Sequence, residues 1–369
     1  MYLKKIVLRA FRNYRSLEVA LAPGLNLFYG DNAQGKTNLL EAVFFLGTLR
    51  SFRGVKGGAV ISWGEKEGRV AGEAAGAAGA GRGAGRTKRL EVGLEKGGRK
   101  VALDGKRPRS AAEYLLALRV ISFSPEDLFL AKEHPSARRR FLDRSVFHLN
   151  PAYLETANRC RAAYKQLNAA IKAGDRKVVA SWEEVAAPLV GEVIFFRRNR
   201  AEELMPLASH LFGKVLGGGK LEITYKSAVR GADKKELAAA CRALMEKRRA
   251  ESMKRGHCLV GPHTDDLALT LSGRDIRATA SRGQSRLALL ALALADAELY
   301  KEQTGEHPVL LLDDPASELD AKRRGALAEY IRDLGQVLVT STDADLLGGR
   351  GVQKYKVEAG EDGYARVTS

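Results

Sequence analysis

An eight-residue segment near the N-terminus carries the residue types that bind the phosphates of a nucleotide. It reads Gly30-Asp31-Asn32-Ala33-Gln34-Gly35-Lys36-Thr37 and fits the pattern G-x-x-x-x-G-K-[ST]. Its glycines let successive backbone amides close around phosphate oxygens at the start of a helix. We therefore expect Lys36 to contact the β- and γ-phosphates and the Thr37 hydroxyl to bind Mg²⁺.

Two adjacent carboxylates follow an apolar run in the last third of the chain. Asp313 and Asp314 come directly after Val309 to Leu312. A buried parallel strand delivers its last residues to the ligand-binding edge of a sheet. There Asp313 is predicted to hold Mg²⁺ and Asp314 to polarise an attacking water. A solvated turn remains the alternative, and Asp320 is either a helix cap or a residue at a subunit junction.

A third segment, Ser281-Arg282-Gly283-Gln284, precedes an apolar stretch from Leu287 to Leu299. Ser281 is a good helix N-cap, so the helix start would offer an anion a hydroxyl, a glycine backbone and the positive end of the helix dipole. The chain already has one phosphate-binding helix start at Lys36. A second one makes sense if it serves the nucleotide of another subunit, although an ordinary capped core helix would look the same.

Alternating strand-like and helical patterns must position these segments. Strands are predicted over 3–9, 17–21, 25–29, 59–61, 90–94, 100–103, 120–123, 221–225, 309–312 and 336–340. A helix is predicted over 37–49, and residues 135–255 are mostly helical and Arg-rich, without a lasting heptad pattern. Residues 71–86 are almost entirely Gly, Ala and Arg, which predicts a flexible loop.

The charge of the chain indicates a polyanionic partner. Lys and Arg number 61 against 44 Asp and Glu, a formal net charge of +17. Residues 131–255 alone hold 26 basic and 14 acidic residues. The longest apolar run, Leu287 to Ala295, falls far short of the roughly 18–20 residues that span a bilayer. Three distant cysteines argue against a disulfide framework or a zinc site and favour the cytoplasm.

The order of the three segments resembles that of the ATP-binding-cassette (ABC) ATPases of chromosome maintenance and repair, and among them the bacterial recombination mediators. Further segments carry the same likeness: Leu8 to Tyr14, Arg50 to Arg53, Ser124 to Leu128, Arg139 to Asp143 and Gly261 to Asp266. The resemblance implies an α/β P-loop ABC-type ATPase head with an inserted, mostly helical lobe and no long coiled coil. Residues 1–120 and 256–369 would form the ATPase domain, and 121–255 the basic lobe that meets DNA or partners.

The resemblance also implies roles for individual residues. Arg12 and Asn13 should border the nucleotide, and Gly30 to Thr37 should wrap it. Ser281, Arg282, Gly283 and Gln284 should bind the γ-phosphate across a dimer. The residues implied in catalysis are Lys36, Ser281, Gln284, Asp314 and Asp320, with Thr37 and Asp313 as the metal ligands.

The partners implied are ATP and Mg²⁺, a second copy of the chain in an ATP-dependent homodimer, and double-stranded DNA near single-strand/double-strand junctions. RecR, together with RecO, would be the protein partner. We expect slow, DNA-stimulated ATP hydrolysis that releases the DNA. The charge of residues 131–255 makes Arg138, Arg139 and Arg140 candidate DNA contacts.

The sequence departs from the wider family at two places. No Gln lies between Gln34 and Gln166, where a Gln loop is expected, and no His follows His307, where a switch His is common. Val339-Thr340-Ser341-Thr342-Asp343 stands in its place. Four alternatives remain: a transporter ATPase subunit, an SMC-type structural ATPase, a nucleotide-free binding module, and an ATPase that acts on DNA without loading a mediator.

Overall fold

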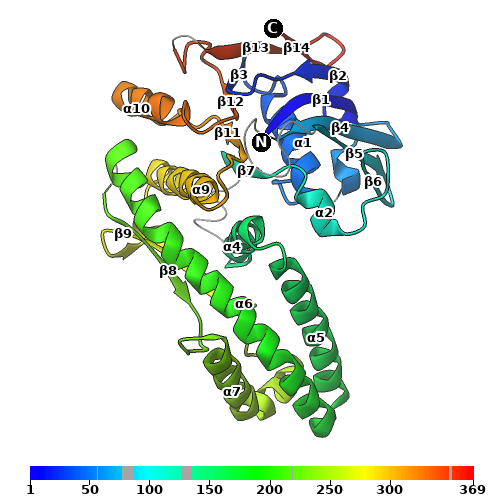
Figure 1. The fold of residues 1–369 in the computed structure, drawn as a ribbon, viewed down its shortest axis with the longest axis vertical. Coiled ribbons are helices and arrows are strands. Elements are labelled where there is room, and N and C mark those ends of the chain that lie inside the picture. Colours follow the sequence, from blue (N-terminus) through cyan, green and yellow to red (C-terminus); the bar gives the residue numbers. More distant parts are fainter. Residues whose placement is uncertain (56, 77–86, 126–134, 218, 349–350) are drawn as a thin grey trace. The chain divides into compact units, whose positions relative to one another are not determined.

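The structure is a computed structural model that describes residues 1–55, 57–76, 87–125, 135–217, 219–348 and 351–369. It divides the chain into two compact units (Figure 1). The first unit comprises Met1–Leu128, His210–Gly219 and Ser281–Ser369, and the second comprises Phe129–Ser209 and Lys220–Ala280. Each unit is therefore assembled from segments that are distant in the sequence.

A six-stranded, mostly parallel sheet forms one layer of the first unit, in the order β14-β13-β3-β12-β11-β7. Its strands are β3 (Leu25–Tyr29), β7 (Val120–Phe123), β11 (Val309–Asp313), β12 (Val337–Ser341), β13 (Val352–Ala359) and β14 (Ala365–Thr368). All neighbouring pairs are parallel except β13 with β14. Because β3 and β11 run in the same direction, the loop after β3 and the end of β11 share one edge.

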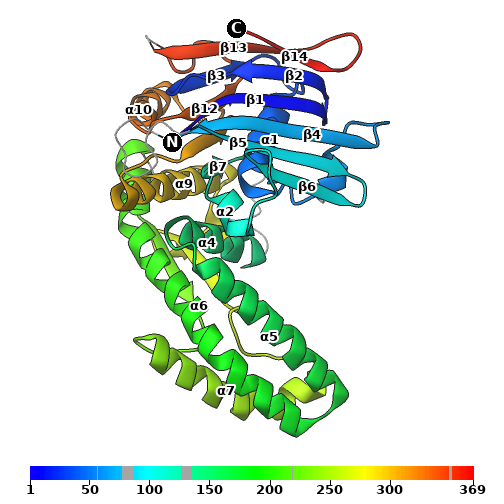
Figure 2. The same cartoon turned by 45° about the vertical axis from the view of Figure 1, so that its right-hand side comes forward.

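A five-stranded antiparallel sheet forms the second layer, in the order β2-β1-β4-β5-β6. Its strands are β1 (Tyr2–Phe11), β2 (Tyr14–Ala20), β4 (Glu67–Ala75), β5 (Thr87–Glu95) and β6 (Gly98–Leu103). Helix α1 (Lys36–Thr48) packs against strands of both sheets (Figure 2). Its apolar side chains are buried on every side, as expected for a helix enclosed between two layers.

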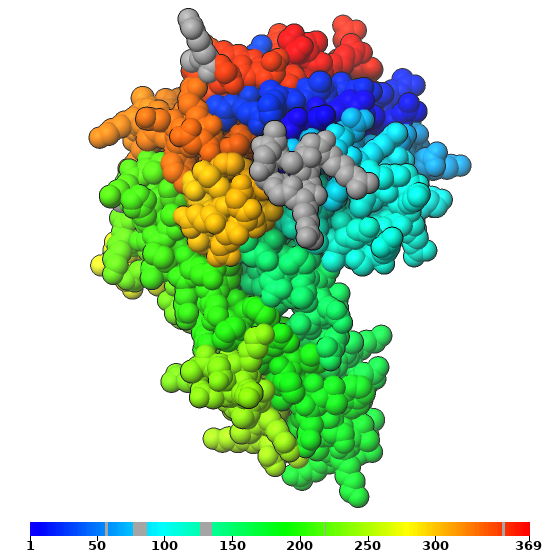
Figure 3. Space-filling model, in the orientation of Figure 1, coloured from blue at the N-terminus to red at the C-terminus, as the bar shows by residue number. Residues whose placement is uncertain are grey.

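The remaining elements of the first unit are η1 (Gly57–Val60), α2 (Ala111–Leu115), the π-helical turn η4 (Leu211–Val215), α9 (Arg282–Thr304) and α10 (Ala321–Ile331). The turn η4 contacts α9 and α10, which is why His210–Gly219 groups with this unit. In the space-filling view the blue N-terminal and red C-terminal segments form one continuous surface (Figure 3). Contacts between β2 and β14 join these segments.

The second unit is mostly helical. Its elements are α4 (Pro135–Leu149), α5 (Tyr153–Ala173), α6 (Arg176–His210), β8 (Leu221–Lys226), α7 (Lys234–Arg255), β9 (Asp266–Leu271), β10 (Arg274–Asp275) and α8 (Ile276–Thr279). Leu167, Val190, Leu237 and Met245 are buried where the helices pack. Together the two units confirm the predicted fold class, a P-loop α/β head with an inserted helical lobe.

The unit boundaries differ from the predicted ones for a topological reason. β7 pairs with β11, so residues 121–125 belong to the first unit. β9 pairs with β8, so residues 256–280 belong to the second unit rather than to the head. No helix in the described ranges is long and apolar enough to cross a membrane.

Two local predictions were wrong. The predicted flexible loop over 71–86 begins as strand, because Ala71 to Ala75 pair with both β1 and β5. Residues 77–86 of that prediction lie outside the described residues. The predicted strand over 59–61 is instead the end of η1 followed by a single bridge from Ile61 to Phe11.

Candidate nucleotide-binding site

The loop between β3 and α1 has the backbone of a phosphate-binding loop. Gly30 and Gly35 have φ values of 149° and 115°, which side chains of L-residues rarely allow. A Cβ atom at Gly30 would lie 2.2 Å from the carbonyl oxygen of Val357. The Lys36 ammonium folds over the loop and donates to the carbonyl oxygens of Gly30 and Asp31 at 2.6 and 2.7 Å. The Lys36 ammonium thus lies over a loop with the expected backbone.

Burial lowers the pKa of Lys36, and the nearby carboxylates of Asp314, Asp313 and Asp31 act in the opposite direction. A desolvated ammonium that forms no ion pair with any described residue is suited to an anionic ligand, because a phosphate would supply the missing charge. The tip of the loop is available to such a ligand, since Asp31, Asn32 and Ala33 are exposed.

The residues predicted to bind a metal ion lie together. The Thr37 hydroxyl is 2.8 and 3.0 Å from the two carboxylate oxygens of Asp313. The Thr340 hydroxyl donates to Asp313 Oδ1 at 2.5 Å. Hydroxyl and carboxylate oxygens are the hard donors that Mg²⁺ prefers, so this donor set fits the predicted ion. Residues 276 positions apart in the sequence meet here because β3 and β11 end at the same edge.

The backbone of Asp314 is held in an unusual conformation. Its φ is 49°, a left-handed value that costs a non-glycine residue about 1–3 kcal/mol. Three hydrogen bonds hold it: its amide donates to Thr340 Oγ1 at 2.9 Å, and its carbonyl accepts from Arg286 Nη2 at 2.7 Å and from the Ser317 hydroxyl at 3.3 Å. The same guanidinium is 3.3 Å from Glu318 and lies over the Phe123 ring. Helix α9 therefore fixes the backbone that carries the predicted water-activating carboxylate.

Ser281 is confirmed as the N-cap of α9. Its hydroxyl oxygen accepts from the Gln284 amide at 3.1 Å, and the Gln284 side chain accepts from the Ser281 amide at 2.9 Å, which completes a capping box. Ser281, Arg282 and Gln284 are exposed, and a Cβ atom at Gly283 would lie 3.0 Å from Glu318 Oε2. Within the described part of the chain, no hydrogen bond or ion pair links this segment to the phosphate loop.

Asp320 is the N-cap of α10, which confirms the first of the two roles that the sequence left open for it. Its carboxylate accepts from the Arg323 amide at 2.9 Å. The other alternative, a place at a subunit junction, stays a prediction.

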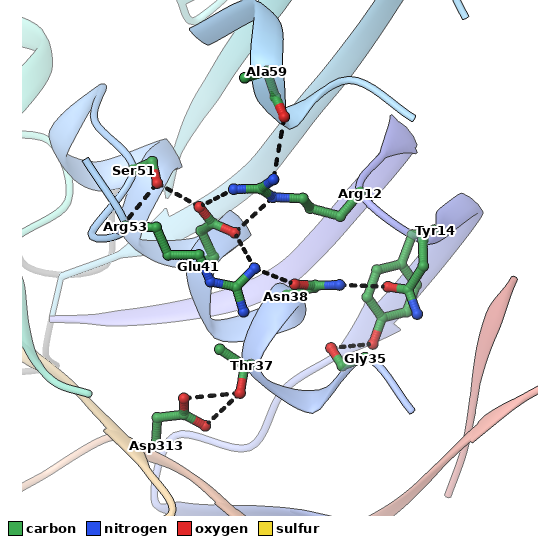
Figure 4. Close-up of polar contacts among 11 residues, drawn as sticks. Arg12, Tyr14, Gly35, Thr37, Asn38, Glu41, Ser51, Arg53, Ala59 and Asp313 are labelled. Carbon is green, nitrogen blue, oxygen red and sulfur yellow. Dashed lines mark hydrogen bonds and ion pairs between the residues drawn. The ribbon is translucent and has the colours of Figure 1, made fainter. Parts of the chain in front are cut away.

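A second polar network is centred on Glu41, one turn further along α1 than Thr37 (Figure 4). Glu41 is fully buried, and its carboxylate accepts from Arg12 Nε and Nη2, each at 2.8 Å. Ser51 donates to the same carboxylate at 2.5 Å, and Arg53 Nη1 is 3.4 Å from it. The guanidinium of Arg12 is thus paired with Glu41, and its predicted place beside the nucleotide stays a prediction.

Asn13 does border the phosphate loop. Its side-chain amide donates to the Gln34 carbonyl at 3.4 Å, and its oxygen accepts from Asn38 at 2.8 Å. Arg53 in turn donates to Asn38 at 2.8 Å, so the network runs from Glu41 to the loop. Sequence reasoning missed Glu41, although a lone carboxylate within an apolar helical stretch is a recognisable signal of a buried, paired charge.

The three candidate DNA contacts on α4 differ in their surroundings. Arg138 is only 2% exposed, and its Nε and Nη2 donate to Asp266 at 2.6 and 2.9 Å. The prediction for Arg138 is therefore wrong, because its charge is neutralised inside the fold. Arg139 is half-buried and donates to the Asp265 carbonyl at 2.7 Å, whereas Arg140 is exposed.

The structure describes the segment that stands in place of the switch His, but only part of the region where a Gln loop is expected. In place of the switch His, Thr340 bonds both Asp313 and the Asp314 amide. In place of the Gln loop, Phe123 ends β7 beside Arg286, but residues 126–134 lie outside the described residues.

A phosphate-binding loop, two carboxylates at the end of a neighbouring parallel strand and a capped helix start define the class of ABC-type ATPase heads. Residues 2–364 match the family described as "RecF/RecN/SMC N terminal domain", and the chain belongs to this family. The chain is 37% identical to the DNA replication and repair protein RecF of Anaeromyxobacter dehalogenans, over 94% of each chain. It is 38% identical to RecF of Symbiobacterium thermophilum, over 94% of this chain and 92% of the relative.

Solved structures support the same assignment. A structure described as the recombination mediator protein RecF with ATP, in the RecFOR pathway, has a TM-score of 0.87 and 30% identity. The match covers 100% of this chain and 99% of the other. An SMC head bound to the winged-helix domain of ScpA has a TM-score of 0.60 at 17% identity, which supports the fold alone. The resemblance to recombination mediators inferred from the sequence is confirmed.

Proposed function

We propose that the chain is an ATP-dependent DNA-binding protein of replication and recombinational repair in the cytoplasm. ATP binds between two copies, and the resulting homodimer clamps duplex DNA near single-strand/double-strand junctions. There it helps RecR, with RecO, to load. Slow, DNA-stimulated ATP hydrolysis opens the dimer and releases the DNA.

One observation carries this proposal: the chain holds both parts of a shared site but does not join them. Lys36, Thr37 and Asp313 are assembled on one edge of the sheet. The Ser281–Gln284 segment is capped, exposed and unconnected to that edge by any bond in the described part of the chain. A second copy would supply this segment to the first copy's phosphate loop. The names of the relatives support a role in DNA replication and repair and in ATP binding.

The chain's own residues perform distinct tasks in this mechanism. The Lys36 ammonium exchanges its carbonyl partners for phosphate oxygens, and Thr37 and Asp313 hold the metal ion. Mg²⁺, when bound there, would offset negative charge on the phosphates. The Asp314 carboxylate orients a water and accepts its proton. The backbone amides and positive helix end at Ser281 of the other copy stabilise the γ-phosphate.

Hydrolysis is expected to be slow because Thr340 occupies the place where many relatives have an imidazole. Its hydroxyl is already engaged by Asp313 and the Asp314 amide. A hydroxyl in this position keeps the two carboxylates in place but does not carry a proton as imidazole does. This suits a switch that stays closed on DNA.

Sedimentation velocity with a non-hydrolysable ATP analogue tests the proposal. The wild-type chain should form a dimer only with the analogue present. Lys36→Met should remain a monomer, because it removes the phosphate contact while leaving the loop glycines in place. A wild-type chain that stays monomeric, or an analogue-induced dimer of Lys36→Met, would contradict the shared-site mechanism.

A further inference from the structure

Most arginines on α6 and α7 in the second unit are neutralised by neighbours. Arg249 is 2.6 Å from Glu183, Arg242 is 2.6 Å from Glu184, and Arg248 is 2.9 Å from Glu251. These pairs hold the helices together or cancel charge locally, so they add little to the attraction of a polyanion. The paired arginines of these two helices are therefore weak candidates for a polyanion-binding surface.

Helix α5 carries cations that are not neutralised. Arg161, Lys165 and Lys172 are exposed, and none forms an ion pair with any residue in the described ranges. The Arg161 guanidinium makes one hydrogen bond, to Asn158 Oδ1 at 2.8 Å. The single acidic residue of α5, Glu155, lies in its first turn.

The three cations lie on one face of the helix. At 100° per residue, positions 161, 165 and 172 fall within an arc of about 40°, and at 1.5 Å per residue they span about 16 Å. The buried side chains of α5, among them Leu167 and Ala170, lie on the opposite side. Glu155 is turned about 100° away from the centre of the cations. Of the exposed residues between Arg161 and Lys172, Ala162 and Ala169 lie nearest the three cations and are small, whereas Gln166 is turned about 120° from their centre. We call Arg161, Lys165 and Lys172 the α5 basic stripe.

A straight row of unpaired cations separated by small side chains is complementary to a regular polyanion. We propose that the α5 basic stripe binds the phosphate backbone of duplex DNA. This inference rests on the proposed function and names a surface for it. Single-strand binders present aromatic side chains for base stacking. None of the exposed residues between Arg161 and Lys172 is aromatic, so the stripe contacts phosphates rather than bases.

A matched pair of triple variants tests this surface. The first, Arg161→Gln/Lys165→Gln/Lys172→Gln, removes the stripe while keeping good helix formers at exposed positions. The control, Lys234→Gln/Arg242→Gln/Arg255→Gln, removes the same charge from α7, where each cation is paired with a glutamate. Circular dichroism and the analogue-induced dimer should be unchanged in both.

Duplex affinity is then measured by fluorescence anisotropy, with the ATP analogue, over a series of salt concentrations. In the stripe variant, the plot of the logarithm of the association constant against log salt should be flatter, its negative slope smaller in size by about 2–3. Binding should be weaker by at least about tenfold at 0.1 M salt. The control should keep a slope near that of the wild type.

The other possible outcomes show whether the α5 basic stripe is wrong as the DNA-binding surface or whether the proposed function itself is wrong. A stripe variant with the wild-type slope would overturn the surface while leaving the proposed function intact. Equal losses in the two triple variants would show that only total charge matters and would overturn it as well. Loss of RecR binding with unchanged duplex binding would assign the stripe to an acidic protein surface instead. A wild-type chain that does not bind duplex DNA would refute the proposed function itself.

Discussion

Removal of the Arg286 guanidinium should slow ATP hydrolysis without weakening ATP binding. Arg286 donates to the Asp314 carbonyl at 2.7 Å and is nearly buried, whereas Lys36, Thr37 and Asp313 make no bond to it that the structure gives. If Asp314 orients the attacking water, then its backbone must keep its left-handed conformation while the γ-phosphate is attacked. Arg286→Met removes the only charge-assisted one of the three hydrogen bonds that the structure gives to this backbone.

The size of the effect follows from the contacts that are lost. A hydrogen bond from a charged donor contributes about 1.5–3 kcal/mol. The left-handed backbone of Asp314 stores about 1–3 kcal/mol, which favours relaxation once the bond is gone. If the lost hydrogen bond appears in the barrier, the hydrolysis rate falls about 10- to 100-fold. Arg286→Lys should recover part of this loss, because an ammonium can still donate to the carbonyl.

Single-turnover hydrolysis of radiolabelled ATP measures the chemical step, and titration with a fluorescent ATP analogue measures binding. Arg119→Met is the matched control, since Arg119 lies over Tyr300 near the other end of α9. It should hydrolyse ATP at the wild-type rate. A wild-type rate in Arg286→Met would refute the role of this residue. An equal loss of analogue binding would show that the substitution damages the whole site instead.

Three further predictions concern the loop, the buried network and pH. Gly30→Ala should abolish analogue binding in the same titration, because the new Cβ would meet the Val357 carbonyl oxygen at 2.2 Å; retained binding would contradict the loop geometry. Glu41→Gln should lower the free energy of unfolding by about 3 kcal/mol in urea denaturation, since Arg12 loses a buried charged partner; an unchanged midpoint would show that the network is dispensable. Burial lowers the pKa of His263 below its ordinary value of 6.5. The neutral imidazole therefore stabilises the fold fully above pH 6.5, and this stability is lost as the pH falls from 6.5 through the lowered pKa. The urea midpoint should therefore fall between pH 7.5 and 5.5 more steeply in the wild type than in His263→Gln, and parallel curves would exclude this histidine.

Local patterns were enough to predict the centre of the site. The phosphate loop, the strand ending at Asp313 and the capped start of α9 each depend on a few neighbouring residues, so they can be read from a short stretch of sequence. The meeting of the phosphate loop and Asp313 at one sheet edge follows from the rule for parallel strands. The fold class could therefore be predicted from motifs that each involve only a few neighbouring residues.

The errors arose where distant residues decide the structure. Residues 71–75 read as a flexible loop because they are small, yet small residues are needed there. A Cβ atom at Gly72 would lie 2.7 Å from Leu46 of α1 and 2.9 Å from the Lys5 carbonyl. Arg138 read as a surface cation because its partner, Asp266, is 128 positions away. No local pattern contains either contact.

The central claim is that each reaction centre is built from two copies of the chain. It is tested by mixing two inactive variants, Lys36→Met and Ser281→Arg. Each variant alone should have almost no ATPase activity. In a mixed dimer, the intact phosphate loop of the Ser281→Arg copy meets the intact Ser281 segment of the Lys36→Met copy. An equimolar mixture should therefore recover activity, up to about half that of the wild type, since neither variant is expected to dimerise alone and each mixed dimer has one complete site of two. No recovery from two variants that are folded and dimerise with wild-type chain would contradict the account.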